Sequence, residues 1–200
     1  MKENFGDFVV REIPFNALLI TSGLPASYKT ETAEVIAELR GFPILRTDLI
    51  RLEVLKGEDI FDEKVAANMQ KRESVYEEMF KRADDIIMKG RGLILDATFV
   101  KCSLRIKAAE IALKHRKTFI IQQTQCPEEV SLRRIAKRTK DNYESNALTP
   151  QAYYNNKDKF EEINLDSLKQ RFPKLKIMHF IVDTTSDEPD KWYVIFKDTR

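Results

Sequence analysis

The sequence is poor in cysteine, in net charge and in long apolar runs, and each shortage excludes a class of protein. Its two cysteines, Cys102 and Cys126, lie far apart without a CxxC pair or a histidine at metal spacing, which argues against a zinc site and a disulfide framework. The 34 Lys and Arg residues nearly balance the 32 Asp and Glu residues, so a net charge of +2 provides no overall field for nucleic acid. No stretch approaches the ~20 apolar residues that span a bilayer, and residues 1–15 lack the apolar core of a signal peptide. We therefore expect a cytoplasmic protein without a membrane partner, in which any anion site is local.

Short apolar runs alternate with stretches of helical periodicity along the chain. Because right-handed crossovers between parallel strands need about this much chain, the alternation predicts an α/β fold with a mostly parallel five-stranded sheet and helices on both faces. Ligands of such sheets bind outside the C-terminal strand ends. The expected strands are 16–23, 42–48, 93–98, 117–125 and 176–186, and the expected helices are 29–40, one from about 49, 63–89, 104–112, 126–138 and one from 150 to about 163.

The first strand runs into a near match to the phosphate-binding loop, or P-loop, whose signature is GxxxxGK followed by Ser or Thr. In "GLPASYKT", Gly23, Lys29 and Thr30 are in place, and Tyr28 stands where the second glycine belongs. With a strand before it and a helix after it, backbone N–H groups can hold phosphates, Lys29 can pair with the β and γ oxygens, and Thr30 can bind magnesium. An ordinary strand-to-helix turn with a surface lysine is the alternative. The residues predicted to bind the phosphates here are Gly23, Leu24, Pro25, Ala26, Ser27, Tyr28, Lys29 and Thr30.

Tyr28 raises a steric question about this loop. Glycine at that place can take a positive φ and has no Cβ in the way of the phosphates. A residue other than glycine there costs roughly 1–2 kcal/mol if the position needs positive φ. If the phenol ring projects into the β-phosphate site, it blocks binding; if it points outward, the N–H groups still converge and Lys29 still reaches the phosphates.

Four blocks of sequence, taken together, resemble small P-loop kinases of the zeta-toxin and gluconate-kinase type. They are "GLPASYKT", "RTDLIR", "GLILDATF" with Arg105 following, and "CPEEVSLRRIAKR" followed by "ESNAL". The resemblance is strongest to AAA-type ATP-binding kinase modules found alone or fused to aminoglycoside-phosphotransferase-like domains, and it runs from about residue 17 to 186. It implies a three-layer P-loop NTPase fold of nucleoside-kinase type with a small helical lid, ATP and Mg²⁺ as cofactors, and phosphoryl transfer to a hydroxyl of an unidentified small-molecule acceptor.

The resemblance also implies a division of the chain. We expect a single P-loop kinase-like domain over residues 1–200, with a core at about 16–186 and a lid at about 133–150. The extensions at 1–15 and 187–200 are apolar and β-prone, and we expect them to cover a sheet edge or to form a subunit contact. The sequence does not indicate the oligomeric state.

The resemblance assigns roles to two aspartates at predicted strand ends. Asp48 faces the acceptor and either takes its proton or orients it, and Asp96 supports Mg²⁺ directly or through water, together with Thr30. Lys29 and Asp48 are thereby expected to be catalytic. A helix-capping role is the structural alternative for each aspartate.

Four arginines complete the expected site. By the resemblance, Arg105 is catalytic and contacts the acceptor or the transferred phosphate, and Arg51, about one helical turn beyond Asp48, faces the acceptor. Arg134 and Arg138, four residues apart on one helix, close over the γ-phosphate, and Arg138 is catalytic. Solvated helix faces are the ordinary alternative for each arginine.

Two other functions remain open for the same core. A 5′-hydroxyl polynucleotide kinase needs clustered Lys and Arg, which only residues 114–117 and 133–140 offer, so nucleic acid is a partner that the near-neutral charge does not favour. A nucleotide-binding regulatory module without turnover is the other alternative, if Tyr28 abolishes catalysis.

Overall fold

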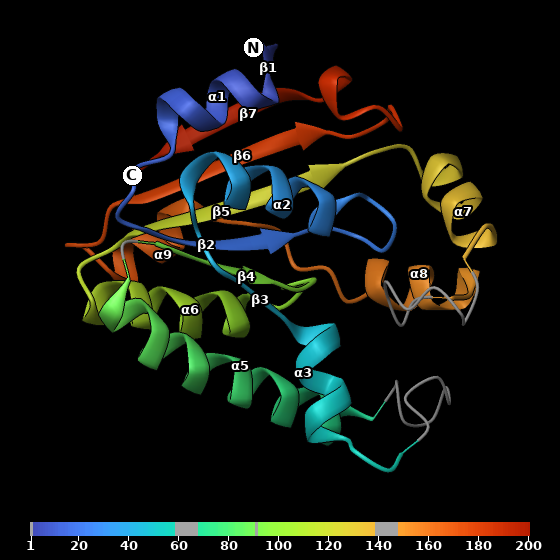
Figure 1. Ribbon diagram of the computed structural model, residues 1–200, viewed down its shortest axis with the longest axis horizontal. Helices are drawn as coiled ribbons and strands as arrows, with labels where there is room; N and C mark the ends of the chain where they lie inside the picture. The colour runs from blue at the N-terminus through green and yellow to red at the C-terminus, as the bar shows by residue number, and fades with distance from the viewer. Residues whose placement is uncertain (1, 59–67, 91, 139–147) are drawn as a thin grey trace.

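The computed structural model describes residues 2–58, 68–90, 92–138 and 148–200. Its centre is a seven-stranded sheet in the order β1-β7-β6-β5-β2-β4-β3 (Figure 1). The strands are β1 (Glu3–Asn4), β2 (Ala17–Ser22), β3 (Ile44–Arg46), β4 (Leu93–Asp96), β5 (Thr118–Gln125), β6 (Ile177–Asp183) and β7 (Tyr193–Thr199). The helices are α1 (Phe5–Glu12), α2 (Lys29–Arg40), α3 (Thr47–Val54), α5 (Met69–Lys89), α6 (Cys102–Lys114), α7 (Glu128–Ala136), α8 (Pro150–Lys157) and α9 (Leu165–Arg171), with a 3₁₀ turn at Pro189–Lys191.

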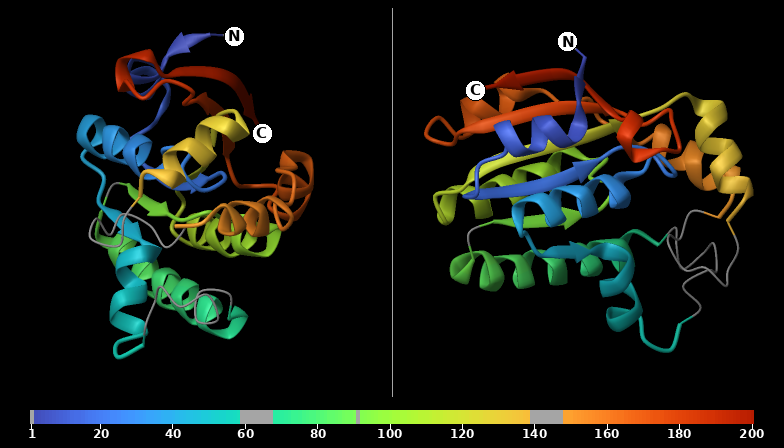
Figure 2. Two further views of the ribbon diagram at one scale, coloured as in Figure 1. Left: turned by 90° about the vertical axis from the view of Figure 1, so that its right-hand side faces the viewer. Right: turned by 45° about the horizontal axis from the view of Figure 1, so that its top comes forward.

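Five adjacent strands, β6, β5, β2, β4 and β3, are parallel, which confirms the predicted sheet. All six residues of β2 are buried, as expected for a strand that is covered on both faces. Its side chains alternate between two cores: Leu18 packs with α5, α6 and α9, whereas Leu19 packs with α1 and α2. Figure 2 shows these helices on opposite faces of the sheet. The fold is therefore the three-layer α/β P-loop NTPase fold.

The terminal extensions add two strands to the five that the sequence predicts. Strand β7 runs antiparallel to β6, and β1 runs antiparallel to β7, so the extensions cover the β6 edge of the sheet. Residues 5–12, expected to be β-prone, instead form helix α1. Phe5, Phe8 and Val9 follow a helical spacing and are buried, and the Asn4 side chain accepts a hydrogen bond from the Asp7 N–H at 3.3 Å.

One expected helix differs from the structure at its C-terminal end. The helix expected to reach about residue 163 ends at Lys157, and a further helix, α9, follows at Leu165. Asn164 caps α9, because its side chain accepts a hydrogen bond from the Ser167 N–H at 2.9 Å. The first residues of the helix expected at 63–89, and residues 139–147 of the expected lid, lie outside the described residues.

The C-terminal ends of the five parallel strands meet at one edge of the sheet. Residues 23–28 leave β2 there, α3 begins directly after β3, and Asp96 is the last residue of β4, paired in register with Arg46. The candidate site lies where the sequence predicts it, at these strand ends.

No helix in the described ranges is long and apolar enough to cross a membrane.

Candidate functional site

Gly23 opens the loop between β2 and α2 in a conformation that requires glycine. Its φ is +143°, and a Cβ at this residue would lie 2.6 Å from Thr124 Oγ1 and 2.9 Å from the Thr124 carbonyl oxygen. Both contacts are shorter than van der Waals packing allows, and the latter involves backbone. The first glycine of the P-loop signature is therefore fixed by close packing against β5.

Side chains from neighbouring strands hold the middle of the loop. The Ser27 hydroxyl lies 2.6 Å from the Thr124 hydroxyl and 2.7 Å from the Leu24 carbonyl oxygen. The Thr184 hydroxyl, just beyond β6, donates to the Ser27 carbonyl oxygen at 3.0 Å. The loop is thus anchored by polar contacts from β5 and from the residue that follows β6.

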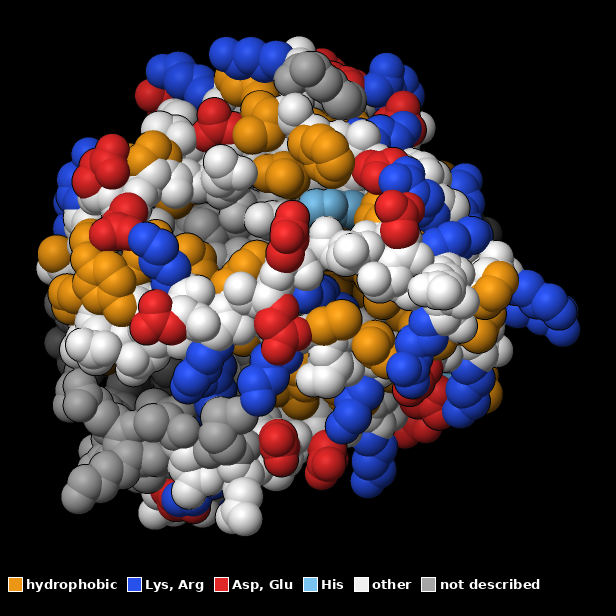
Figure 3. Space-filling view, turned by 180° about the vertical axis from the view of Figure 1, so that it is seen from behind, with side chains coloured by type: hydrophobic (Ala, Val, Ile, Leu, Met, Phe, Trp, Pro, Cys, Tyr) orange, Lys and Arg blue, Asp and Glu red, His pale blue; other side chains and the backbone are white. Residues whose placement is uncertain are grey.

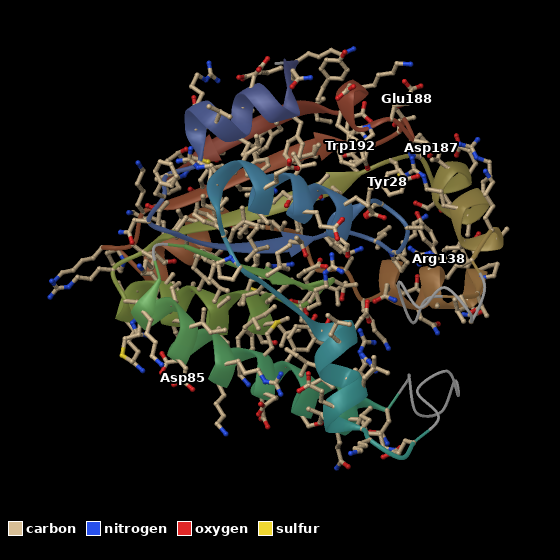
Figure 4. All side chains as sticks on the ribbon, viewed as in Figure 1. Tyr28, Asp85, Arg138, Asp187, Glu188 and Trp192 are labelled. Carbon is tan, nitrogen blue, oxygen red and sulfur yellow. The ribbon has the colours of Figure 1, made fainter. Side chains whose placement is uncertain are left out.

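Tyr28 takes the left-handed conformation that glycine normally supplies at this place, with φ 57° and ψ 38°. Its ring centroid lies 3.8 Å from the guanidinium carbon of Arg134 and 5.6 Å from the ring centroid of Trp192. The phenol hydroxyl donates to Asp187 Oδ1 at 2.9 Å. The ring is therefore directed toward α7 and the β6–β7 connection (Figure 4), which is the outward alternative of the steric question.

Lys29 and Thr30 begin α2, directly beside Asp96. The Thr30 hydroxyl donates to Asp96 Oδ2 at 2.6 Å, and the Thr21 hydroxyl donates to Asp96 Oδ1 at 2.9 Å. Lys29 Nζ donates to the Leu24 carbonyl oxygen at 2.7 Å. Burial lowers the pKa of the Lys29 ammonium, and the negative charge of Asp96 opposes that change. The loop lysine, the threonine and the strand-end aspartate therefore form one polar centre.

The oxygen atoms of Thr30 and Asp96 fit a magnesium ion. Mg²⁺ prefers oxygen ligands and is commonly held by one or two protein side chains together with nucleotide phosphates and water. Within the described residues, no group of three or more His, Cys, Asp or Glu side chains could hold a metal without such help. Asp96 is itself buried, so a cation beside its carboxylate would be only partly solvated.

Asp48 lies in the first turn of α3 and faces the same centre. Arg46 is the N-cap of this helix, so Asp48 is not the capping residue. Burial, followed by the negative charge of Asp96, raises the pKa of the Asp48 carboxyl from 3.8 to about 6, against the opposing positive charges of Arg51, Lys29 and Arg138. Asp96, Arg51, Lys29 and Arg138 therefore all lie close enough to Asp48 for their charges to act on its carboxyl group.

Arg138, Arg51 and Arg46 are arginines that the structure brings to this centre, and Arg46 Nε lies 4.0 Å from Asp96 Oδ2. The positive charge of Arg138 acts on both Lys29 and Asp48, and its half-buried side chain lies at the same end of the sheet as the P-loop (Figure 4). Arg51 is buried in α3, 9% exposed, one turn beyond Asp48. Arg138 and Arg51 both lie near enough to Asp48 for their charges to act on it, and their contacts with phosphate and acceptor stay predictions.

Glu31 is a site residue that no sequence motif predicted. It lies in the first turn of α2 and is half-buried. Burial raises the pKa of its carboxyl, and the charges of Lys29 and Arg138 oppose this effect. An acidic residue in the first turn of the helix that follows a P-loop, where the helix dipole favours it, is the signal that indicates it.

Arg134, expected over the γ-phosphate, instead binds backbone oxygens beside the loop. Its side chain is 8% exposed and donates to the carbonyl oxygens of Ala26 at 3.2 Å and Thr184 at 2.8 Å. Its Nε also donates to Asp187 Oδ1 at 2.9 Å. These contacts hold the P-loop to the β6–β7 connection and differ from the expected phosphate contact.

Arg105, expected to contact acceptor or phosphate, is 1% exposed. Its guanidinium donates to four carbonyl oxygens, those of Phe99 at 2.9 Å, Val100 at 3.3 Å, Glu161 at 2.8 Å and Glu162 at 3.0 Å. The side chain ties the connection after β4 to the segment before α9. The structure therefore gives Arg105 an anchoring role and does not place it with Lys29 and Asp48.

The sequence pattern of one protein family, described as AAA domain, matches residues 18–172. The chain belongs to this AAA domain family. A comparison with curated protein sequences gives no match.

Several solved structures resemble this AAA domain, and kinases and Kti12 are among them. A gluconokinase from Sinorhizobium meliloti 1021 is 17% identical with a TM-score of 0.56, and the alignment covers 86% of this chain and 85% of the other. A sugar kinase from Janibacter sp. HTCC2649 is 15% identical with a TM-score of 0.60, covering 89% and 90%. Kti12 from Chaetomium thermophilum, in complex with ADP-AlF3, is 18% identical with a TM-score of 0.60, covering 86% and 92%. The likenesses confirm the P-loop kinase-like fold.

The family match leaves out both ends of this AAA domain. Residues before 18 include β1 and α1, and residues after 172 include β6 and β7. Three residues that support the P-loop, Thr184, Asp187 and Trp192, lie in the unmatched C-terminal part. The loop of the family core is therefore held partly by segments outside that core.

Proposed function

We propose that this AAA domain is a kinase that transfers the γ-phosphate of ATP to a hydroxyl group of a small-molecule acceptor, with Mg²⁺ as cofactor. The observation that carries the proposal is the meeting of Lys29, Thr30 and Asp96 at the P-loop with Asp48 facing them. Phosphoryl transfer depends mainly on positioning and on charge stabilisation, and this centre offers groups for both.

Lys29 and Arg138 supply positive charge for the transferring phosphoryl group. Thr30 and Asp96 would hold Mg²⁺, which when bound neutralises charge on the β and γ oxygens. Glu31 lies among these groups, close enough for the charges of Lys29 and Arg138 to act on it. We assign it the role of holding the two cations in place.

Asp48 is the residue that we assign to the acceptor hydroxyl. A carboxylate with a pKa of about 6 is ionised at neutral pH and is more basic than an ordinary aspartate, so it can accept the hydroxyl proton as transfer proceeds. Arg51, one turn further along α3, would orient the acceptor or partly balance its charge. Arg105 and Arg134 have no part in this proposed set, because their guanidinium groups bind backbone carbonyls.

A small-molecule acceptor is favoured over a nucleic-acid end by the distribution of charge. On the face shown in Figure 3, Lys and Arg side chains are interspersed with Asp and Glu. A protein that follows a phosphate backbone presents a basic stripe or patch, and its binding weakens steeply with salt. Activity on small acceptors is therefore expected to fall less steeply with salt than binding along a phosphate backbone would.

Calorimetric titration of ATP with Mg²⁺ tests the nucleotide half of this proposal. Wild type is expected to bind, Lys29→Ala to lose binding, and Lys89→Ala to bind as wild type does, because Lys89 is an exposed lysine at the end of α5. Absence of binding by the wild type, or equal binding by Lys29→Ala, would overturn the proposal.

Transfer of radiolabelled γ-phosphate to a panel of sugars, nucleosides and amino sugars tests the acceptor half. Wild type is expected to label at least one small hydroxyl compound, and Asp48→Asn to label none while still binding ATP. Labelling only of 5′-hydroxyl oligonucleotides would replace the small-molecule acceptor by a nucleic-acid end. Binding of ATP with no transfer to any acceptor would identify a nucleotide-binding module without turnover.

A further inference from the structure

Tyr28 lies within a group of four side chains that joins the P-loop to the end of the chain. We call Tyr28, Arg134, Asp187 and Trp192 the Tyr28 cluster. The Arg134 guanidinium carbon lies 3.8 Å from the Tyr28 ring centroid on one side, and the Trp192 ring is 5.6 Å away. Asp187 accepts hydrogen bonds from both the Tyr28 hydroxyl and Arg134 Nε, each at 2.9 Å. Figure 4 shows Tyr28, Asp187 and Trp192 near one another at this end of the sheet.

The cluster acts on the two loop residues that have unfavourable backbone angles. Ala26 and Tyr28 both have positive φ, 60° and 57°, although neither is glycine. Such residues persist where surrounding contacts hold them in place. A single guanidinium supplies contacts to both, because Arg134 donates to the Ala26 carbonyl oxygen at 3.2 Å while it stacks on the Tyr28 ring. Side-chain contacts therefore maintain a loop shape that glycine would adopt without help.

Trp192 connects this cluster to the first residues of the chain. It is 1% exposed, and its indole N–H donates to the Ser186 carbonyl oxygen at 2.9 Å. The Phe5 N–H donates to the Trp192 carbonyl oxygen at 3.0 Å, and the two rings lie 6.3 Å apart. Phe5 and Trp192 both lie outside the family match at 18–172. The loop is thus supported through Tyr28 by segments that lie outside the family match.

We propose that Tyr28 is a positioning residue of the nucleotide site, which holds the P-loop in its phosphate-binding shape before nucleotide arrives. It acts through Arg134 and Trp192, and it makes nucleotide affinity depend on the terminal segments. The proposal rests on the proposed function, because it gives that same loop its preorganisation. The P-loop signature has glycine at this position, so glycine would ordinarily be expected to improve binding. In this protein, the replacement Tyr28→Gly is instead expected to weaken nucleotide binding.

The test measures loop order without nucleotide and affinity for ADP with Mg²⁺. Amide hydrogen exchange of residues 23–30 is expected to quicken in Tyr28→Gly, and the dissociation constant for ADP to rise roughly tenfold, as when only about a tenth of the molecules hold the competent loop. Tyr28→Phe keeps the ring contacts and is expected to stay within about threefold of wild type, because the stacking partners remain. Phe196→Ala is the matched control: this half-exposed aromatic on β7 contacts the His179 ring and is expected to change neither measurement.

Tighter or unchanged ADP binding by Tyr28→Gly, together with unchanged exchange of the loop amides, would overturn the proposal. Asp187→Asn is a second variant at an exposed position that weakens the same cluster without removing a buried group, and faster loop exchange is expected from it as well. If wild type itself fails to bind ADP, the proposed function fails, and the exchange comparison of the nucleotide-free proteins still decides whether Tyr28 orders the loop.

Discussion

Replacement of Asp48 by asparagine is expected to stabilise the folded chain at neutral pH while it abolishes phosphoryl transfer. Asp48 is half-buried beside Asp96, and burial together with that neighbouring charge raises its pKa from 3.8 to about 6. The ionised carboxylate therefore lowers the free energy of unfolding, whereas a neutral side chain of similar shape does not. Catalysis needs the carboxylate, whereas stability favours its absence, so the two measurements are expected to move in opposite directions.

The size and the sign of this effect follow from the two pKa values. A difference of about two pKa units corresponds to about 3 kcal/mol. Between pH 3.8 and about 6 the folded state retains a proton that the unfolded state has released, so the free energy of unfolding falls as pH rises through this window. Asp48→Asn is therefore expected to gain about 3 kcal/mol at pH 8, roughly half of that at pH 5, and little below pH 3.8. For a chain of this size, the gain at pH 8 raises the melting temperature by roughly 6–12 °C.

Urea unfolding at pH 8 and pH 5, followed by the fluorescence of the buried Trp192, measures the two gains. Asp85→Asn, at an exposed aspartate on α5, is the matched control and is expected to change stability by less than about 0.5 kcal/mol at either pH. Turnover of the wild type is expected to rise with pH up to about 6 and then to level, because the base must be ionised. A variant less stable than wild type at pH 8, or equally stabilised at both pH values, would refute the reasoning.

Three further predictions concern packing. Gly23→Ala is expected to lose roughly 1–3 kcal/mol of stability, measured in urea, and to weaken ADP binding, because the added Cβ meets Thr124 at 2.6 Å and the residue has positive φ; unchanged values would contradict the close-packing account. Arg105→Met is expected to cost at least about 3 kcal/mol because four carbonyl oxygens lose their donor, and loss of turnover without loss of stability would restore its predicted acceptor role. Deletion of residues 2–12 uncovers one side of β7 and is expected to cause association detectable by light scattering, whereas an unchanged particle size would contradict the edge-covering role of that segment.

The sheet and its ligand-binding edge could be predicted from sequence because their signals are local. A parallel strand covered on both faces is a continuous apolar run, which Leu18 to Ile20 display, and its exit into a glycine loop and a helix is visible in the same few residues. Lys29, Thr30 and Asp96 follow from the same pattern and meet in the structure. The confirmed fold rests on these short segments.

The arginines show what such local patterns cannot provide. Arg105 and Arg134 occupy motif positions that resemble functional ones, but their partners include backbone oxygens about fifty or more residues further along the chain, at Glu161, Glu162 and Thr184. Only the tertiary structure reveals such pairings. Helix α1 was mistaken for a β-prone segment for a related reason, because a short apolar stretch has an ambiguous period until the surface that it packs against is known.

The order of the strands in the sheet has a consequence for how the chain is made. Strand β2 is synthesised before both of its neighbours in the sheet, which are β4, with Leu18 opposite Leu93, and β5, with Ala17 opposite Thr118. At ribosomal rates of about 5–20 residues per second, this fully buried strand waits roughly 5–20 s before both partners exist. Strand β1 waits longer still, because its partner β7 lies at the end of the sequence. A nascent chain of this design must keep its central strand from other apolar surfaces for that interval.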